Sequence, residues 1–365
     1  MSIVSMAENG WLPDTVIRLG IRRLLAERLK RQRVKGRQES RSAESRFADQ
    51  LRQSPMVIGA GRANEQHYEM PARFFDLVLG HRLKYSCGYW PREAMTLDES
   101  EDAMLELTCQ RAQIEDGMDI LELGCGWGSL SLWIAEHYPN SRLLCVSNSH
   151  SQRQHIQRES AKRGLRNVEV VTADITDFKT ECKFHRVLSI EMFEHVRNYE
   201  RVLERIAGWL NSDGKLFVHI FCHRSAAYAF EVDGKSEWMA RHFFTGGIMP
   251  SANLLSHFQR DMLIGERWPV DGTHYSTTCE AWLRNIDNNY SHVLAVLRER
   301  YDAKEACIAV QRWRIFFMAC AELFKYHSGT EWHVAHLLLH QRATDTSVPA
   351  YHSTMRNVHA STAMK

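Results

Sequence analysis

The stretch MDILELGCGWGSL, residues 118–130, decides the fold. Residues 118–123 form a short apolar run, and glycines follow at every second position from Gly124 to Gly128. A helical pattern then continues to about residue 138. Glycines let the backbone turn tightly and pass close to a ligand, and a helix that starts there exposes its first amides. The stretch therefore predicts a buried strand, a ligand-binding loop and a helix, in that order.

The same alternation of strands and helices continues after this stretch. Apolar runs predict further strands at 142–147, 168–173, 185–190 and 215–221. Helical patterns lie between them at 150–163 and about 198–210. Alternation at this spacing produces a parallel sheet with helices on both faces. Ligands of such α/β sheets bind outside the carboxyl ends of the strands. We therefore expect an α/β fold whose site lies at that edge of the sheet.

Changes in composition divide the chain into six segments. We expect a basic helical extension at 1–60, a Rossmann-like core at 117–221, a helical and aromatic substrate cap at 222–330, a last core strand at 331–341 and a disordered tail at 342–365. For the remaining segment, 61–116, the family resemblance described below implies a helical cap and cofactor lid. In the extension, residues 16–38 place apolar side chains at helical spacing between arginines and lysines. This pattern favours a helix packed on its own protein, and contact with an anionic membrane surface is the less favoured alternative.

The overall composition excludes several classes of protein. The 365 residues carry a net charge of +2, which argues against a nucleic-acid protein that works by neutralising phosphates. Nine cysteines without a CxxC pair, and histidines without an HExxH set, predict no metal site and reduced thiols in the cytoplasm. Apolar runs also stay well below the ~20 residues that a membrane span needs.

The glycine loop favours a nucleoside-type ligand. A nicotinamide site has the spacing GxGxxG and an acid about 20 residues further on. This chain has GxGxG, and its second strand ends in CVSNSHSQ (145–152) without an acid. The loop therefore predicts a site for S-adenosylmethionine. Asp174, at the end of the third expected strand, is placed to meet an adenine amine, although helix capping explains a lone aspartate equally well.

Three motifs carry a resemblance to a known family. LELGCGWGSL (121–130), YSCGYW (85–90) and MFEHV (192–196) resemble the cyclopropane fatty acid synthase superfamily of S-adenosylmethionine-dependent methyltransferases, most closely its coclaurine N-methyltransferase branch. The resemblance extends over about 66–341 and implies a Rossmann-like class I fold, in which a seven-stranded, mostly parallel sheet carries a helical cap. It also implies ten cofactor-binding residues, namely Tyr85, Ser86, Gly124, Gly126, Gly128, Ser147, Asn148, Gln152, Asp174 and Ile175.

The two branches of this family differ at informative positions. Lipid-modifying members have glycine where this chain has Glu191, whereas N-methyltransferase members have Glu-x-x-Glu-His, as here. HYEMPARFF (67–75), DGTHY (271–275) and GTEWHVAHLL (329–338) also resemble segments of the N-methyltransferases. The expected substrate pocket, from these matches and from the aromatic content of the cap, contains Tyr68, Cys87, His219, Phe244, His274, Phe316 and Trp332.

The resemblance also leaves a lipid substrate open. Cyclopropanating members hold a bicarbonate ion with a cysteine, a glutamate, a histidine and a tyrosine. Cys87, Glu194 and His219 match three of these groups, and the tyrosine position aligns with Phe316. The missing hydroxyl argues against a bicarbonate site. Against the amine interpretation, His219 stands where N-methyltransferases tend to have an acid. For Cys87, a buried small hydrophobic residue is at least as good an explanation as a role in the pocket.

SIEMFEHV (189–196) carries the expected chemistry of the site. A protonated amine has no lone pair, so a base must remove its proton before a methyl group can be transferred. If residues after Ile190 form a helix, Glu191, Glu194 and His195 point to one side, where two carboxylates attract an alkylammonium and the histidine accepts its proton. Aromatic side chains of the cap would surround the sulfonium and the amine.

Three functions compete on these grounds. An N-methyltransferase that acts on a small secondary or tertiary amine of the alkaloid type, such as a tetrahydroisoquinoline, is favoured, with S-adenosylhomocysteine (SAH) as the second product. Methyl or methylene transfer to an unsaturated acyl chain is the enzymatic alternative. A binding protein of methyltransferase shape without activity is the third and is least supported, because the glycine loop and the acid–base cluster are intact. A homodimer is considered but does not follow from the sequence.

Overall fold

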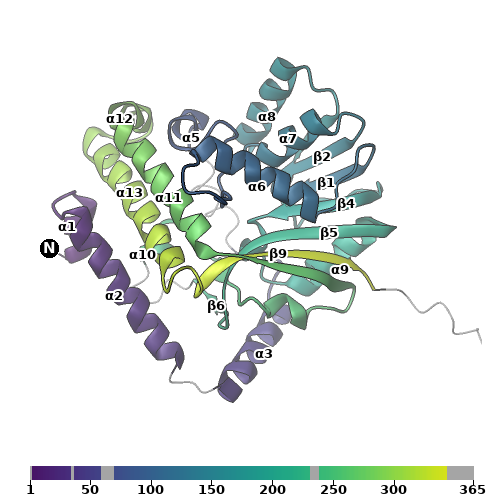
Figure 1. Cartoon of the computed structure of the whole chain (residues 1–365), viewed down its shortest axis with the longest axis horizontal. Helices are drawn as coiled ribbons and strands as arrows, with labels where there is room; N and C mark the ends of the chain where they lie inside the picture. Colours follow the sequence, from purple (N-terminus) through teal and green to yellow (C-terminus); the bar gives the residue numbers. More distant parts are fainter. Residues whose placement is uncertain (1, 34–36, 59–69, 231–237, 343–365) are drawn as a thin grey trace, which may run out of the picture.

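A seven-stranded sheet forms the centre of the molecule (Figure 1). The computed structural model describes residues 2–33, 37–58, 70–230 and 238–342 of the chain, so Tyr68 and the predicted tail at 343–365 lie outside the described residues. The strand order is β3-β2-β1-β4-β5-β9-β8. The bounds are β1 Asp119–Leu123, β2 Arg142–Ser147, β3 Val168–Thr172, β4 Phe184–Ile190, β5 Leu210–His223, β8 Met262–Val270 and β9 Trp332–Gln341.

The sheet confirms the predicted fold class. Strands β3, β2, β1, β4 and β5 are parallel, while β9 runs antiparallel to both β5 and β8. The five strands expected from apolar runs are all present, as is the late strand near 331–341. Strand β8 was not expected: it lies within 222–330, which the sequence assigns to the cap, yet it forms an edge of the main sheet.

Side chains that alternate along the strands fill two layers of core. On one face, Ile120 and Phe217 pack with residues of α6, α7 and α8. On the other face, Leu121 and Val187 pack with α3 and α9. This period of two is expected for strands covered by helices on both faces. The bounds are α3 Arg37–Gln53, α6 Leu97–Arg111, α7 Ser129–His137, α8 His150–Arg163 and α9 Tyr199–Trp209.

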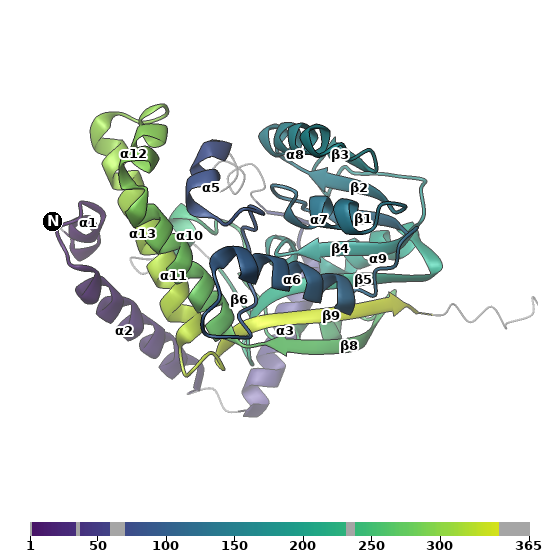
Figure 2. The ribbon, with the colours of Figure 1, turned by 45° about the horizontal axis from the view of Figure 1, so that its top comes forward.

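A helical layer covers the edge of the sheet at which the parallel strands end (Figures 1 and 2). Its largest members, α11 and α13, pack closely against each other. Large aromatic side chains fill their contact, including Trp282, Trp313 and Phe317. The bounds of the layer are α1 Ile3–Glu8, α2 Asp14–Arg33, α5 Ala72–Val78, α10 Trp238–His242, α11 Gly272–Asn288, α12 Tyr290–Arg298 and α13 Ala303–Lys325. The cap therefore combines segments from both ends of the chain.

The N-terminal extension is helical and packs on its own protein. Arg18 donates to Glu280 at 2.6 Å and to Glu322 at 3.0 Å, and Arg22 donates to Glu322 at 2.6 Å, which ties α2 to α11 and α13. Ile17 is buried in the same contact. Within the described parts of the chain, the helices all lack the combination of length and apolar composition that a bilayer crossing requires. The smaller elements are η1 Phe193–His195, β6 Tyr228–Ala229, β7 Ile248–Met249 and η2 Leu254–His257.

Candidate active site

The glycine loop connects β1 to α7 through left-handed backbone conformations. Gly124, Gly126 and Gly128 have φ angles of +76°, +53° and +83°. The amide of Gly124 donates to the carbonyl of Val146 at 2.9 Å, which holds the loop against the end of β2. A Cβ on Gly128 would lie 2.7 Å from Cγ1 of Ile156 in α8. Glycine is thus needed at Gly128 both for the backbone and for the close approach of α8.

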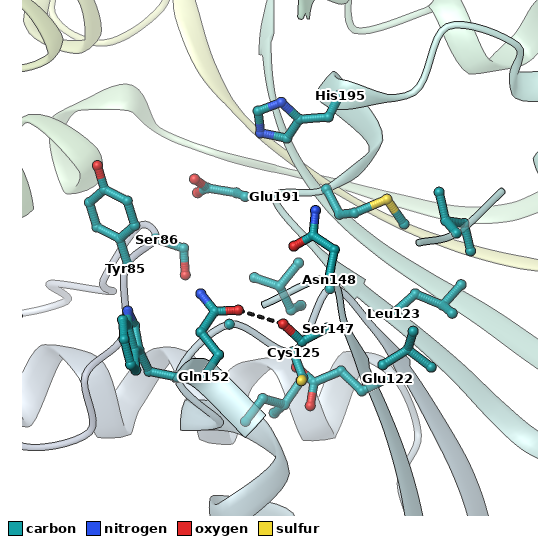
Figure 3. A pocket seen from close by; sticks show the side chains of 18 of the residues that line it. Tyr85, Ser86, Glu122, Leu123, Cys125, Ser147, Asn148, Gln152, Glu191 and His195 are labelled. Atoms are coloured by element: carbon teal, nitrogen blue, oxygen red, sulfur yellow. Dashed lines mark hydrogen bonds between the residues drawn. The ribbon is translucent and has the colours of Figure 1, made fainter. Parts of the chain in front are cut away.

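This loop forms the floor of a cavity at the carboxyl ends of β1, β2 and β4 (Figure 3). Of the ten predicted cofactor-binding residues, all but Gly128 line this cavity, which we call the cofactor cavity. Gly128, at the end of the loop, packs against Ile156 of α8 instead. Residues from five separate segments therefore meet as the resemblance implies, namely 85–86, 124–126, 147–148, 152 and 174–175.

Polar groups in the cofactor cavity suit a nucleoside-type ligand. The hydroxyl of Ser147 donates to Oε1 of Gln152 at 2.6 Å (Figure 3). Nε2 of Gln152 and Nε1 of Trp127 are buried and have no hydrogen-bond partner among the described residues. Buried donors normally have partners, so both are suited to ligand oxygens. The carboxylate of Asp174 accepts from the amide and the hydroxyl of Thr176, at 2.8 and 2.7 Å, so it also stabilises its own turn. These residues fit S-adenosylmethionine.

Two buried charged residues of this cavity were not predicted. Nζ of Lys84 donates to Oγ of Ser86 at 2.5 Å and to the carbonyl of Cys87 at 2.9 Å. Glu122, the last-but-one residue of β1, accepts from the hydroxyl of Ser131, and burial raises its pKa to about 7. The sequence did offer a signal for Glu122, because a glutamate within the apolar run 118–123 is unusual for a buried strand.

Glu122 makes the stability of the protein depend on pH. Its folded-state pKa lies above the ordinary value of 4.5, so its contribution is fully present below pH 4.5 and is lost as pH rises through about 7. We expect Glu122→Gln to raise Tm relative to the parent at pH 8 and to leave it little changed at pH 5. Calorimetry of both proteins at the two pH values measures this. Substitution of the exposed Glu115 by glutamine should give equal small shifts at both pH values.

A second cavity of about 600 Å³ adjoins the first. Residues of α2, α11 and α13 and the segment 238–249 line it, and Tyr85, Glu191 and His195 belong to both cavities. Its walls are largely apolar and include Phe244 and Phe316, two of the predicted substrate-pocket residues. We call it the substrate cavity. Because the two cavities share these three residues, they lie next to each other at this point.

Four other predicted pocket residues line neither of these cavities. Nδ1 of His274 accepts from the amide of Trp90 at 3.0 Å, and its neighbour Tyr275 faces the substrate cavity instead. Trp332 is fully buried and donates to the hydroxyl of Tyr228 at 3.2 Å. Cys87 and His219 are also buried, and the amide of Cys87 and the ring of His219 contact Glu191. Sequence motifs placed these residues near the site but could not show which side chains face the cavity.

Glu191 is the centre of a buried hydrogen-bond network. Its Oε1 accepts from the amide of Cys87 and from Nε2 of His219, each at 3.1 Å, and its Oε2 accepts from the hydroxyl of Tyr275 at 2.5 Å. The expected helix after Ile190 is wrong, because Glu191 has a φ angle of +47° and only the short turn η1 follows. Glu191, Glu194 and His195 nevertheless all line the substrate cavity.

The environment gives these three residues different protonation states. Burial and the charge of Glu191 raise the pKa of Glu194 well above its usual range, so Glu194 keeps its proton. Burial also raises the pKa of Glu191, and the hydrogen bond from Tyr275 and the charge of Lys84 oppose this effect. Three hydrogen-bond donors contact the carboxyl group of Glu191, so it is the one of the two acids that is suited to carry the negative charge. Burial lowers the pKa of His195 to about 4, which leaves the ring neutral at pH 7. The site therefore combines an anion, a neutral imidazole and an acid.

Comparison with known proteins gives a consistent result. The profile of the mycolic acid cyclopropane synthetase family matches residues 59–334. An (S)-coclaurine N-methyltransferase from Thalictrum flavum subsp. glaucum is 38% identical, and the alignment covers 94% of this chain and 96% of that protein. A pavine N-methyltransferase from the same plant is 32% identical over 93% of this chain and 97% of that protein. The resemblance inferred from the sequence motifs is thus confirmed.

Solved structures agree with this assignment. A crystal structure of coclaurine N-methyltransferase bound to N-methylheliamine and SAH superposes with a TM-score of 0.90, at 37% identity, and covers 93% of this chain and 98% of that one. The cyclopropane synthase MmaA2 from Mycobacterium tuberculosis superposes with a TM-score of 0.67 at 22% identity, and covers 79% of this chain and all of that one. The second likeness concerns the fold alone.

Proposed function

This chain belongs to the mycolic acid cyclopropane synthetase family of S-adenosylmethionine-dependent methyltransferases, and we propose that it methylates the nitrogen of a small secondary or tertiary amine. The observation that carries this proposal is the carboxylate of Glu191, which lies where the cofactor and substrate cavities meet. A buried anion at this junction attracts an alkylammonium. The aromatic residues of the substrate cavity suit an alkaloid-like amine, for which a tetrahydroisoquinoline is the first candidate.

The cofactor cavity would hold S-adenosylmethionine through the glycine loop, Gln152 and the segment around Tyr85. When bound, this cofactor supplies an electrophilic methyl group on a positively charged sulfur, which leaves as a neutral thioether. The protein contributes the position of the amine relative to that methyl group. Such positioning supplies roughly 7–11 kcal/mol in well-aligned intramolecular reactions. Tyr85, which belongs to both cavities, lies where the two ligands would meet.

Glu191 and His195 would prepare the amine for attack. The carboxylate of Glu191 holds the incoming ammonium, and the neutral ring of His195 accepts its proton, which frees the nitrogen lone pair. The charge of Glu191 favours the protonated ring, which partly offsets the effect of burial on the pKa of His195. Phe244 and Phe316 exclude water from the other side of the amine.

A lipid substrate remains the alternative, and the size and apolar walls of the substrate cavity favour it. The resemblance implies that cyclopropanating members hold bicarbonate with groups that include those aligned with Cys87 and His219. In this chain Glu191 places its own carboxylate against both residues and against a tyrosine hydroxyl, that of Tyr275. We therefore expect no bicarbonate dependence, which favours the amine.

An activity comparison separates these substrates. The purified protein is incubated with labelled S-adenosylmethionine and either a panel of secondary and tertiary amines or vesicles of unsaturated phospholipid, each with and without bicarbonate. We expect methyl transfer to amines only, without an effect of bicarbonate. Transfer to lipid alone would overturn the amine proposal, and bicarbonate-dependent transfer would also overturn the interpretation of Glu191.

Substitution of His195 tests the base. We expect His195→Ala to lower kcat for the amine by 10²-fold or more, the usual range for loss of a positioned acid–base group being roughly 10²–10⁴. SAH affinity, measured by calorimetry, should change little. His274 is the matched control, since it is a half-buried histidine that lines neither cavity, and His274→Ala should retain kcat within a few-fold. Equal losses in the two variants would exclude His195 as the base.

A further inference from the structure

A chain of buried side chains leads from Glu191 through the sheet to Arg111. Oε1 of Glu191 lies 3.1 Å from Nε2 of His219, and Nδ1 of His219 lies 2.9 Å from Nε2 of His336. Nδ1 of His336 in turn lies 2.9 Å from a guanidinium nitrogen of Arg111 in α6. The two histidines are direct cross-strand partners on β5 and β9, and both are fully buried. Four side chains from separate elements thus form one continuous series.

Arg111 fixes the direction of every hydrogen bond in this series. A guanidinium has donors only and does not lose its proton, so Nδ1 of His336 must accept. The proton of a neutral His336 is then on Nε2 and is donated to Nδ1 of His219. The proton of a neutral His219 is therefore also on Nε2, where it is donated to Glu191. Burial lowers the pKa of both histidines well below the usual value, and the charges of Arg111 and Lys84 act in the same direction, so both rings are neutral.

We propose that Arg111 and His336 are positioning residues that set the tautomer of His219, so that His219 always presents an N–H to Glu191. The proposal deepens the proposed function, since it explains how the central carboxylate is kept available as an anion. It also excludes this series as a proton route to solvent, because Arg111 cannot accept a proton. The proton removed from the amine must leave on the cavity side, past His195.

Other groups around Glu191 determine how much the hydrogen bond from His219 contributes to the ionisation of Glu191. Lys84, Tyr275 and the amide of Cys87 also favour its ionised form, and neutral His195 lies nearby. Glu194 keeps its own proton and adds no charge. Around the histidines, Phe217 packs edge-on against His336, and Arg111 lies 5.3 Å above the ring of Trp268. The N–H of His219 is thus one of three donors on Glu191, and its loss should be measurable without abolishing ionisation.

The tautomers are read first, in the unmodified protein with SAH and without substrate. Two-bond ¹H–¹⁵N correlation spectra of protein labelled in its histidine rings identify the protonated nitrogen, and single substitutions assign the two signals. We expect both rings to be neutral at pH 7 with the proton on Nε2. A proton on Nδ1 in either ring, or an imidazolium, would overturn the proposal. This measurement needs no turnover, so its failure is separate from failure of the proposed function.

The functional consequence is read from the pH dependence of kcat/KM for the amine. With one donor fewer, the carboxylate of Glu191 is less stabilised, so its pKa rises. The acid limb of the profile, where kcat/KM falls as the pH is lowered, therefore moves to higher pH. We expect Arg111→Met and His336→Leu to shift this limb upward by about one pH unit, with near-parent values on the alkaline side. His336→Gln keeps a donor and an acceptor at similar positions and should retain the parent profile.

Controls distinguish positioning from a merely structural role. Arg186 is a buried arginine near Arg111 that donates to the carbonyls of Ala112, Gln113 and His185, and it has no hydrogen bond to His219 or His336 among the described residues. Arg186→Met should lower Tm without moving the acid limb. Three results would overturn the proposal: an unshifted limb in Arg111→Met, a uniform loss of activity at all pH values, or equal shifts in His336→Gln and His336→Leu.

Discussion

Replacement of Glu191 by glutamine is expected to lower kcat/KM for an amine by about 10²-fold or more, with little change in SAH affinity. The amide is nearly isosteric but neutral, so it no longer attracts an ammonium or stabilises a protonated His195. Glutamine also brings donors into a site where Cys87, His219 and Tyr275 already donate. Loss of a group that acts in proton transfer usually costs roughly 10²–10⁴ in rate.

Glu331→Gln is a matched control for this substitution. Glu331 is a buried glutamate beside His223 and Arg224 that lines neither cavity. Steady-state kinetics should show nearly parental kcat/KM for Glu331→Gln, and thermal unfolding should show whether either protein is destabilised. If Glu191→Gln retained full amine turnover, the central argument for an amine substrate would be lost, although the cofactor cavity would stand.

Local sequence patterns predicted the core of the fold correctly. Strand β2 and helix α8 have the predicted bounds, because apolar runs and helical periodicity there are bounded by clear turn residues. Strand β8 was not predicted, since its residues Glu266 and Arg267 interrupt the apolar pattern at the edge of the sheet. Edge strands are half exposed and give weaker patterns than central ones. Periodicity therefore identified the strands with continuous apolar runs, including the other edge strand β3, and missed β8, whose run is interrupted.

The site was predicted less completely, because its contacts join distant segments. Motifs identified Glu191 and the glycine loop, but the periodicity argument for Glu191 assumed a helix that is not there. Tyr275 lies next to His274 in the quoted motif, and only its position on α11 shows that it reaches Glu191. No local sequence pattern relates Arg111 to His336, which lies 225 residues further along the chain. Contacts of this kind depend on the register of β5 and β9, which the sequence pattern does not specify.

Gly126→Ala is expected to weaken SAH binding by tenfold or more while the protein stays folded. Gly126 has a φ angle of +53°, which costs an alanine roughly 1–2 kcal/mol. A Cβ at this position meets no atom within 4 Å among the described residues, so the protein itself accommodates the methyl group. Gly126 lines the cofactor cavity, however, and there the methyl group competes with the ligand for space. Calorimetric titration with SAH and thermal unfolding measure the two effects separately.

Gly164→Ala isolates the effect of the backbone from that of the ligand. Gly164 has a φ angle of +69°, caps the end of α8, and a Cβ there also meets no atom within 4 Å in the described part of the chain. The two variants should therefore lose similar stability, and only Gly126→Ala should lose SAH affinity. Gly128→Ala differs from both, because contact with Ile156 should destabilise the fold itself. If Gly126→Ala and Gly164→Ala bound SAH equally well, the loop would not approach the cofactor closely, and the ligand would have to be placed elsewhere in the cavity.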